Sequence, residues 1–256
     1  RGIVAIAMAS IFAHDLTEMG RGHADFLVPL VFLVILATGG LYGLTIKPIG
    51  TLLGICKKSQ QGVLIVGAQK WARNIGLKLQ SLGIKVVVID SNKTNIRLAG
   101  REKLKAYHEN ALKDGVDERV DLDDIGRLLC LTPNDEANSL IALNFQSVFG
   151  KENIYQLAPA PIEDGEAEEQ VPKHLRGRYL FSTDLHYQNI SKMAVESNLK
   201  VLEIMDNMDY ARVIGNKETN VPLFIVSADG DVEICVLNDS IEPSRGQRVV
   251  YLVKQD

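Results

Sequence analysis

The sequence predicts a membrane α-helical segment, with two C-terminal transmembrane helices of which the first is truncated. An α/β domain with a doubly wound parallel sheet follows, and then a small mixed α/β C-terminal region. Two observations carry this prediction. Residues 26–46 contain no charged side chain, and a helix of this length rises about 30 Å, enough to cross a bilayer. From residue 62 onward, apolar strands alternate with amphipathic helices, which is typical of a parallel sheet with helices on both faces.

The N-terminal apolar segments predict membrane helices with a defined orientation. Residues 3–13 are expected to be the end of a longer membrane helix. We expect the start of that helix, and further helices before it, to lie upstream of the residues given. The polar loop at 14–25 carries three acidic residues, whereas Lys47, Lys57 and Lys58 follow the second helix with no acid among them. The positive-inside rule therefore places the residues after the second helix in the cytoplasm. The alternative is a buried helix of a soluble protein, which the long uncharged run disfavours.

Composition divides the chain into five segments. The division rests on the apolar start, the lysines that follow it, and a run of acids between residues 163 and 169. We expect the last two transmembrane helices at 1–46, a basic linker at 47–61, the α/β domain at 62–160, an acidic linker at 161–176, and the small α/β region at 177–256.

The α/β domain begins with a strand, a helix and a second strand. Residues 63–66 form a continuous apolar run, as expected for a strand buried on both faces. Apolar side chains then recur at helical spacing from Trp71 to Leu82, and Gly83 is placed to end that helix. A second apolar strand is expected at 85–89, closed by Asp90.

Weaker signals continue this alternation. Ser91 or Asn92 is suited to cap a short helix that ends at Gly100. A weak third strand is expected at 105–107 and a strong fourth strand at 128–131.

The next helix has a clear start signal. Thr132 reads as its N-cap, with Pro133 in the first helical position. Its apolar face is expected to contain Ala137, Leu140, Ile141, Phe145 and Val148. A fifth strand at 153–157 completes the predicted parallel sheet.

The C-terminal region carries strand signals but no recognisable chemical motif. Short strands are expected at 179–181, 199–204 and 247–253. Residues 221–237 read as a hairpin around the pair Asp229–Gly230, because Asp-Gly favours tight hairpin turns.

The turn after the first strand resembles a dinucleotide-binding fingerprint. Gly67 supplies the tight turn, and Ala72 is small enough for the helix to pack on the strand. The second glycine of the fingerprint is replaced by Gln69, which could obstruct a diphosphate or hydrogen-bond it. The helix N-terminus offers N–H groups to an anion, and Asp90 is placed to accept from ribose hydroxyls. NAD or an adenine nucleotide is therefore favoured over NADP, because the Asp90 charge opposes a 2′-phosphate.

Composition and missing motifs exclude several functions. The formal net charge of −4 provides no basic face for nucleic acid. The three cysteines lie far apart, as expected for free thiols in a reducing compartment. No histidine pair has metal-ligand spacing, and Walker A, Gly-x-Ser-x-Gly and Tyr-x-x-x-Lys motifs are lacking. We therefore expect neither a metal site nor an enzyme.

Two parts of the chain resemble known families. Residues 1–5 and 8–10 (Arg-Gly-Ile-Val-Ala and Met-Ala-Ser) resemble the last-but-one core helix of bacterial monovalent cation:proton antiporters of the type-1 family. Residues 25–46 resemble the final helix of that core. Residues 63–157 resemble the N-terminal regulator-of-K⁺-conductance (RCK) domain, also called TrkA-N, which is fused to one branch of these antiporters. The closest pieces are 64–68, 131–135 and 153–157.

The resemblance implies a secondary transporter that exchanges Na⁺ or K⁺ for H⁺, with its ion-binding carboxylates on earlier helices. Arg1 matches an intramembrane arginine that pairs with an acid on another helix; the alternative is an interfacial arginine. Ligand contacts carried over from the RCK domain fall on Gly67, Ala68, Gln69, Asp90, Asn110 and Thr132. Gln69, in place of a glycine, and Glu109, where channel relatives often have glycine, depart from the family pattern.

Together these observations predict the C-terminal part of a cation:proton antiporter in the inner (plasma) membrane. The protein would be multi-pass, with its C-terminal domain in the cytoplasm, and would form a homodimer. Its partners would be the lipid bilayer, the preceding transport helices, Na⁺ or K⁺, and H⁺. Three alternatives stay open: a potassium efflux or K⁺ transport regulatory protein, a membrane-anchored NAD-dependent enzyme, and a pure assembly module.

Overall fold

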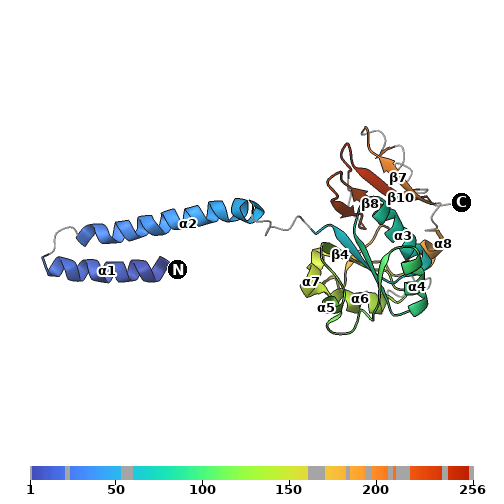
Figure 1. Ribbon diagram of the computed structural model, residues 1–256, viewed down its shortest axis with the longest axis horizontal. Coiled ribbons are helices and arrows are strands. Elements are labelled where there is room, and N and C mark those ends of the chain that lie inside the picture. The colour runs from blue at the N-terminus through green and yellow to red at the C-terminus, as the bar shows by residue number, and fades with distance from the viewer. Residues whose placement is uncertain are drawn as a thin grey trace. The chain divides into compact units, whose positions relative to one another are not determined.

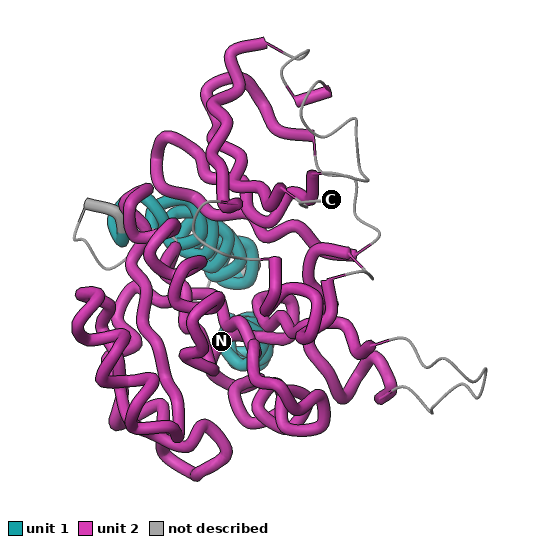
Figure 2. Tube along the Cα trace, turned by 90° about the vertical axis from the view of Figure 1, so that its right-hand side faces the viewer, with its two compact units in different colours: residues 1–58 teal, residues 59–256 magenta. Residues whose placement is uncertain are grey.

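The structure, a computed structural model, describes residues 2–20, 24–52, 60–160, 171–182, 185–193, 198–206, 210–211, 220–237 and 242–253. The chain divides into two compact units, Arg1–Lys58 and Ser59–Asp256 (Figure 2). Arg1 lies outside the described residues, so its predicted ion pair stays a prediction.

The first unit is a pair of helices. Helix α1 (Gly2–Glu18) and helix α2 (Leu27–Leu52) are joined through the short 3₁₀ helix η1 (Ala24–Phe26) and lie side by side (Figure 1). The less exposed residues of α1 recur at helical spacing: Gly2, Ile6, Ala9, Ala13 and Leu16. A Cβ atom at Gly2 would lie 3.1 Å from Cγ2 of Ile35, so this glycine permits the close approach of the two helices.

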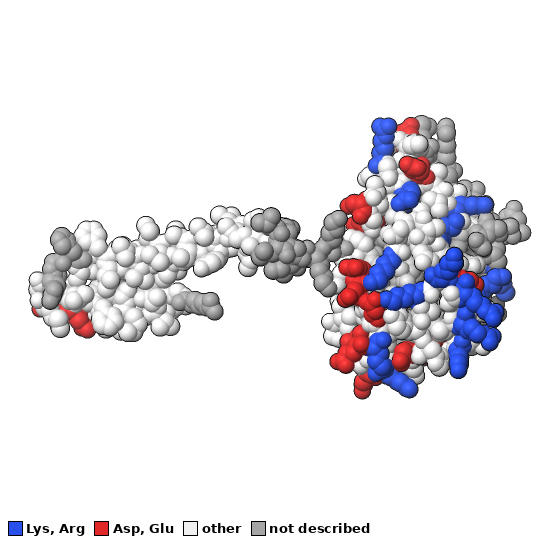
Figure 3. Space-filling view, in the orientation of Figure 1, with Lys and Arg blue, Asp and Glu red and all other residues white. Residues whose placement is uncertain are grey.

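Helix α2 has the length and composition of a membrane span. Its residues Leu27–Gly50 have a mean hydropathy of 2.2, and no residue in their most apolar stretch is buried within the structure. It is the one such helix among the described residues. Large apolar side chains point away from the pair, with Leu36 67% and Leu44 81% exposed. The face in Figure 3 is nearly free of charged side chains along both helices.

The second unit contains a six-stranded parallel sheet with the order β3-β2-β1-β4-β5-β6. The predicted doubly wound sheet is thus confirmed. The strands are β1 (Gly62–Val66), β2 (Val86–Asp90), β3 (Lys105–His108), β4 (Ile125–Cys130), β5 (Ile154–Gln156) and β6 (Arg178–Tyr179). The last strand was expected within the C-terminal region, but it pairs with β5 at the edge of the parallel sheet.

Helices cover both faces of this sheet, as Figure 1 shows. Helices α3 (Lys70–Ser81) and α4 (Lys93–Arg101) pack on the face that carries Val63 and Ile65. The opposite face, with Leu64 and Val66, is covered by α5 (Val116–Arg119), α6 (Asp135–Asn144) and α7 (Gln146–Phe149). The short helices η2 (Lys151–Asn153), η3 (Lys173–Leu175) and α8 (Tyr187–Met193) complete the helical elements described.

A second sheet is antiparallel and has the order β7-β10-β8-β9. Its strands are β7 (Leu199–Glu203), β8 (Asn220–Val226), β9 (Val232–Ile234) and β10 (Arg248–Val253). The predicted hairpin at Asp229–Gly230 is confirmed, because β8 pairs with β9 and Gly230 adopts a φ of +87°. A glycine carries this left-handed backbone without steric cost.

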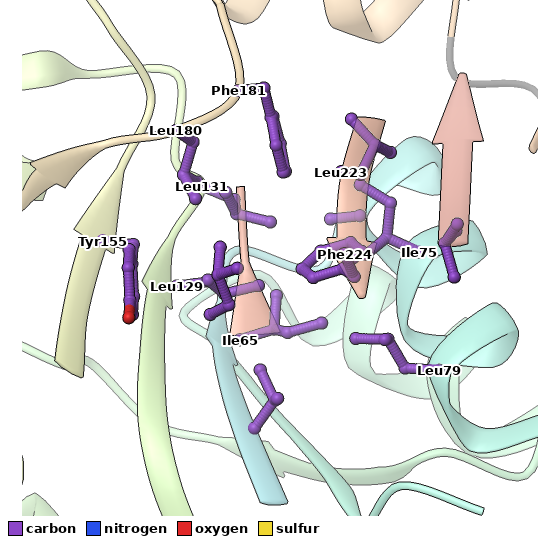
Figure 4. Close-up of a cluster of buried hydrophobic side chains, with 14 of the residues drawn as sticks. Ile65, Ile75, Leu79, Leu129, Leu131, Tyr155, Leu180, Phe181, Leu223 and Phe224 are labelled. Atoms are coloured by element: carbon purple, nitrogen blue, oxygen red, sulfur yellow. The ribbon is translucent and has the colours of Figure 1, made fainter. Parts of the chain in front are cut away.

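The two sheets share one apolar core. Figure 4 shows Ile65 and Leu129 of the parallel sheet, Ile75 of α3, and Leu223 and Phe224 of β8 in one cluster. All five of these side chains are at most 1% exposed. The antiparallel sheet therefore packs on the α3 side of the parallel sheet. The sequence-based division between 62–160 and 177–256 does not coincide with a break in packing.

The helix after β4 differs from its prediction in start and face. It begins at Asp135, and its N-cap is Asn134, whose side chain accepts from the Ala137 amide at 2.6 Å. Thr132 is not the N-cap, because its hydroxyl donates to Asn138 instead. Leu140 and Val148 are exposed, since the buried face follows the spacing Asn138, Ile141, Ala142 and Phe145.

Candidate functional site

A cleft of about 440 Å³ lies where the parallel strands end. Asp90, the last residue of β2, lines it together with Gly67, Asn110 and Thr132, which follow β1, β3 and β4. Gln69 lines it from the start of α3. In open α/β sheets, ligands bind outside the carboxyl ends of the strands at the point where the strand order reverses, which here falls between β1 and β4. The structure therefore brings these five predicted residues together. Their contacts to a ligand stay a prediction.

Gly67 makes the sharp turn from β1 into α3. Its φ is +104°, and a Cβ atom there would lie 3.0 Å from the carbonyl oxygen of Leu131. Both the backbone angle and the close approach of the neighbouring strand therefore require glycine. Its amide donates to the Ile89 carbonyl at 2.8 Å, which fixes the turn against β2.

Asp90 is held in place by three hydrogen bonds. Its Oδ2 accepts from the Ala68 amide at 2.8 Å and from Nδ2 of Asn95 at 2.9 Å, while Oδ1 accepts from the Asn92 amide at 2.8 Å. A carboxylate offers about four acceptor positions, so one position on Oδ1 is still available for a hydroxyl group. Ala68 thus serves the site through its backbone, and it does not itself line the cleft.

A half-buried ion pair supports the loop between β1 and α3. Nε of Arg73 lies 2.8 Å from Glu102, and Nη1 donates to the Ala68 carbonyl at 2.8 Å. The Arg73 side chain is 5% exposed and that of Glu102 is 35% exposed. Twenty-nine residues separate the pair, so local sequence gave no sign of it.

Gln69 occupies the position of the missing second glycine. Its backbone is extended at the N-cap of α3, and its side chain does not cap the helix. The N–H groups of the first helical turn have no intrahelical partners, so they are available to an anion. Oε1 of Gln69 lies 3.0 Å from where a Gly67 Cβ would be. Among the described residues this buried oxygen has no hydrogen-bond partner, as expected for a group that faces a ligand.

The loop after β4 is organised by a buried asparagine. Oδ1 of Asn138 accepts from the Thr132 amide at 3.0 Å and from the Thr132 hydroxyl at 2.7 Å. Nδ2 of Asn138 donates back to the Thr132 carbonyl at 3.0 Å. Asn138 is fully buried. Sequence reasoning missed this residue because a polar side chain interrupts the expected apolar face.

The described lining of the cleft contains two carboxylates and no basic side chain. Oδ1 of Asn110 accepts from the Leu112 amide at 3.0 Å, which leaves the Asn110 amide nitrogen as a donor. Glu109 also lines the cleft and pairs with Arg119 at 3.4 Å. Asp90 and Glu109 are the charged side chains among the described lining residues. Phosphate binding would therefore depend on backbone N–H groups and amides.

These features fit the ribose and phosphate of a nucleotide. The open helix N-terminus suits a phosphate, and the remaining acceptor on Asp90 suits a ribose hydroxyl. The unpartnered Oε1 of Gln69 is a second acceptor for a hydroxyl group. Gln69 narrows the approach to the backbone but leaves the cleft open. The described residues contain no cluster of three or more side chains suited to a metal ion.

Comparison with known proteins identifies the domain. Residues 63–171 match the TrkA-N domain family, so this part of the chain is a TrkA-N domain. No curated protein sequence matches the chain.

Several solved structures are partly similar to this chain. The NAD(P)-binding domain of an exopolyphosphatase-related protein from Archaeoglobus fulgidus is 20% identical, with 41% of this chain and 79% of that one covered and a TM-score of 0.36. The TrkA-N domain of the inner membrane protein ybaL from Escherichia coli is 21% identical, with 39% and 73% covered and a TM-score of 0.34. The GsuK channel bound to NAD is 13% identical, with 98% of this chain and 56% of that one covered and a TM-score of 0.39. With TM-scores below 0.5, we draw no functional inference from these similarities.

Proposed function

We propose that the TrkA-N domain binds NAD or a related adenine nucleotide in the cleft at the carboxyl ends of β1 to β4. One observation carries this proposal: the Gly67 turn, the uncapped start of α3 and the remaining acceptor on Asp90 converge on one cleft. This is the set of groups that a ribose and its phosphate require.

The charges of the cleft favour NAD over NADP. A 2′-phosphate would lie beside the Asp90 carboxylate, and no lysine or arginine is among the described lining residues to offset the repulsion. ATP, with more negative charge than AMP or NAD, is opposed for the same reason.

Isothermal titration of the whole chain in detergent tests this proposal. NAD and AMP should bind at least tenfold more tightly than NADP. Asp90→Asn should weaken NAD binding about 10- to 100-fold, because a hydrogen bond to a charged acceptor contributes roughly 1.5–3 kcal/mol. Asp117→Asn, on the exposed surface of α5, is the matched control. Absence of heat with every nucleotide would leave only the assembly role for this domain.

We further propose that the helix pair lies in a membrane and that the TrkA-N domain is cytoplasmic. The exposed apolar surface of α2 supports this, because a soluble unit rarely leaves such a helix uncovered. The chain should stay with vesicles after alkaline extraction. Release by alkaline carbonate would contradict the membrane assignment.

For the complete protein we propose regulated transport of a monovalent cation, namely exchange of Na⁺ or K⁺ for H⁺, with the domain acting as a sensor in a homodimer. A TrkA-N domain joined to an apolar helix pair supports this class. A potassium efflux or K⁺ regulatory protein is the second candidate, and ion dependence of flux in vesicles separates the two. Deleting residues 62–256 from the complete transporter should alter its activity or pH profile. The membrane-anchored NAD enzyme predicts NADH turnover, which we do not expect.

A further inference from the structure

The segment that leads into β1 is fixed at the edge of the sheet opposite to the nucleotide cleft. The Gly62 amide donates to the Asp124 carbonyl at 2.7 Å. A Cβ atom at Gly126 would lie 1.9 Å from the carbonyl oxygen of Gln60, so the backbone of Gln60 lies directly against Gly126. This segment is the continuation of the chain from the helix pair.

One guanidinium group joins this segment to both sheets. Nη1 of Arg127, on β4, donates to Oε1 of Gln61 at 2.8 Å, and Nη2 lies 2.9 Å from Oδ1 of Asp231. The same Gln61 oxygen accepts from the Val232 amide at 3.3 Å. Arg127 therefore connects the leading segment, the parallel sheet and the β8–β9 turn. We call this group of four residues the Arg127 clamp.

The Arg127 clamp has features that a flexible lysine could not reproduce. The arginine side chain is only 15% exposed, while that of Asp231 is 52% exposed. Its planar fork holds two acceptors at fixed angles, whereas an ammonium group is a single compact charge. A surface depression of about 330 Å³ adjoins the clamp and is lined by both Arg127 and Asp231.

Strands β1 and β4 connect the Arg127 clamp to the nucleotide cleft. They pair directly, and each begins near the clamp. The loops that follow them line the cleft with Gly67 and Thr132 respectively. Five residues of strand span roughly 17 Å. The amide of Leu131 also donates to the Val66 carbonyl at 2.8 Å at the cleft end. A ligand that shifts one strand against the other at the cleft would thereby change the geometry at Arg127.

We propose that Arg127 is a coupling residue that transmits the state of the nucleotide cleft to the segment leading to the helix pair. This inference rests on the proposed nucleotide binding. Ligand binding shifts the strands, and the Arg127 clamp passes the shift to Gln61 and to the second sheet together. The ligand acts by binding more tightly to one of two clamp arrangements.

Hydrogen exchange of the whole chain in detergent, with and without NAD, tests the proposal. In the wild type, NAD should change exchange at least threefold in peptides covering residues 47–63. Arg127→Gln and Arg127→Lys should raise basal exchange there several-fold and abolish the response to NAD. Both variants should still bind NAD in titrations, because Arg127 does not line the cleft. Their affinity should change only by about the factor lost from the exchange response, since coupling between two sites is reciprocal. A merely structural arginine would leave the response to NAD intact.

Asp231→Asn should act in the same direction as the Arg127 variants. Asp121→Asn, which removes a comparably exposed partner of Lys105, should behave as wild type. The coupling role is overturned if Arg127→Gln retains the NAD response, or if Asp121→Asn loses it equally. Should the wild type fail to bind NAD, the proposed function falls. In that case the clamp is still tested by comparing the basal hydrogen exchange of residues 47–63 in Arg127→Gln and in Asp121→Asn. Equal exchange in the two variants would overturn the role of the clamp.

Discussion

Replacing Asn138 with alanine should destabilise the second unit by removing all three of its hydrogen bonds to Thr132. Each such bond contributes about 1 kcal/mol net, so the loss is about 3 kcal/mol. Alanine regains about 0.6 kcal/mol through its higher helix propensity. The net decrease in the free energy of unfolding is therefore about 2–3 kcal/mol. For a unit of this size, that lowers Tm by roughly 4–12 °C.

Urea unfolding followed by tryptophan fluorescence measures this loss, because Trp71 is the chain's single tryptophan and is buried on α3. Asn144→Ala is the matched control: it lies on the same helix and its side chain donates one hydrogen bond, from Nδ2 to the Ala111 carbonyl at 3.0 Å. The same propensity gain applies to it, so its net cost should be below about 1 kcal/mol. Equal stability of the two variants would refute the role assigned to Asn138.

Three further predictions follow from packing and burial. Gly126→Ala should destabilise the unit by more than about 3 kcal/mol in urea unfolding, since its Cβ would overlap the Gln60 carbonyl; wild-type stability would contradict the close approach. Burial raises the pKa of Cys235 to about 12 and also raises that of Cys130. Both thiols should resist alkylation at pH 8 by mass spectrometry, and their contribution to stability, complete at neutral pH, should fall as pH rises above about 8.5. Arg73→Met should lower the free energy of unfolding by about 2 kcal/mol, a value reduced because its partner Glu102 is partly exposed to solvent. It should also weaken NAD binding in titrations. Unchanged affinity would show that the loop between β1 and α3 keeps its shape without Arg73.

Sequence patterns located the parallel strands because each buried strand is a short apolar run bounded by turn residues. The same reasoning placed Gly67 and Asp90 at adjacent strand ends, where the structure also places them. These elements are local: a few neighbouring residues determine each of them.

The features that sequence did not reveal depend on distant partners. Strand β6 has only two residues, and its position follows from the Gly177 amide, which donates to the buried side chain of Gln156 at 2.9 Å. Thr132 satisfied the local rule for an N-cap, but its hydroxyl is taken by Asn138. The support of the loop between β1 and α3 by Arg73 similarly requires a carboxylate from another helix end.

The apolar layer between the two sheets has a practical consequence for dissecting this molecule. A fragment ending near residue 160 would lose β6 and the whole antiparallel sheet, and would leave Leu129 and Leu131 facing water. Such a fragment would tend to aggregate. The smallest piece that folds autonomously should therefore run from Gln60 to Val253, and it should melt in a single cooperative transition.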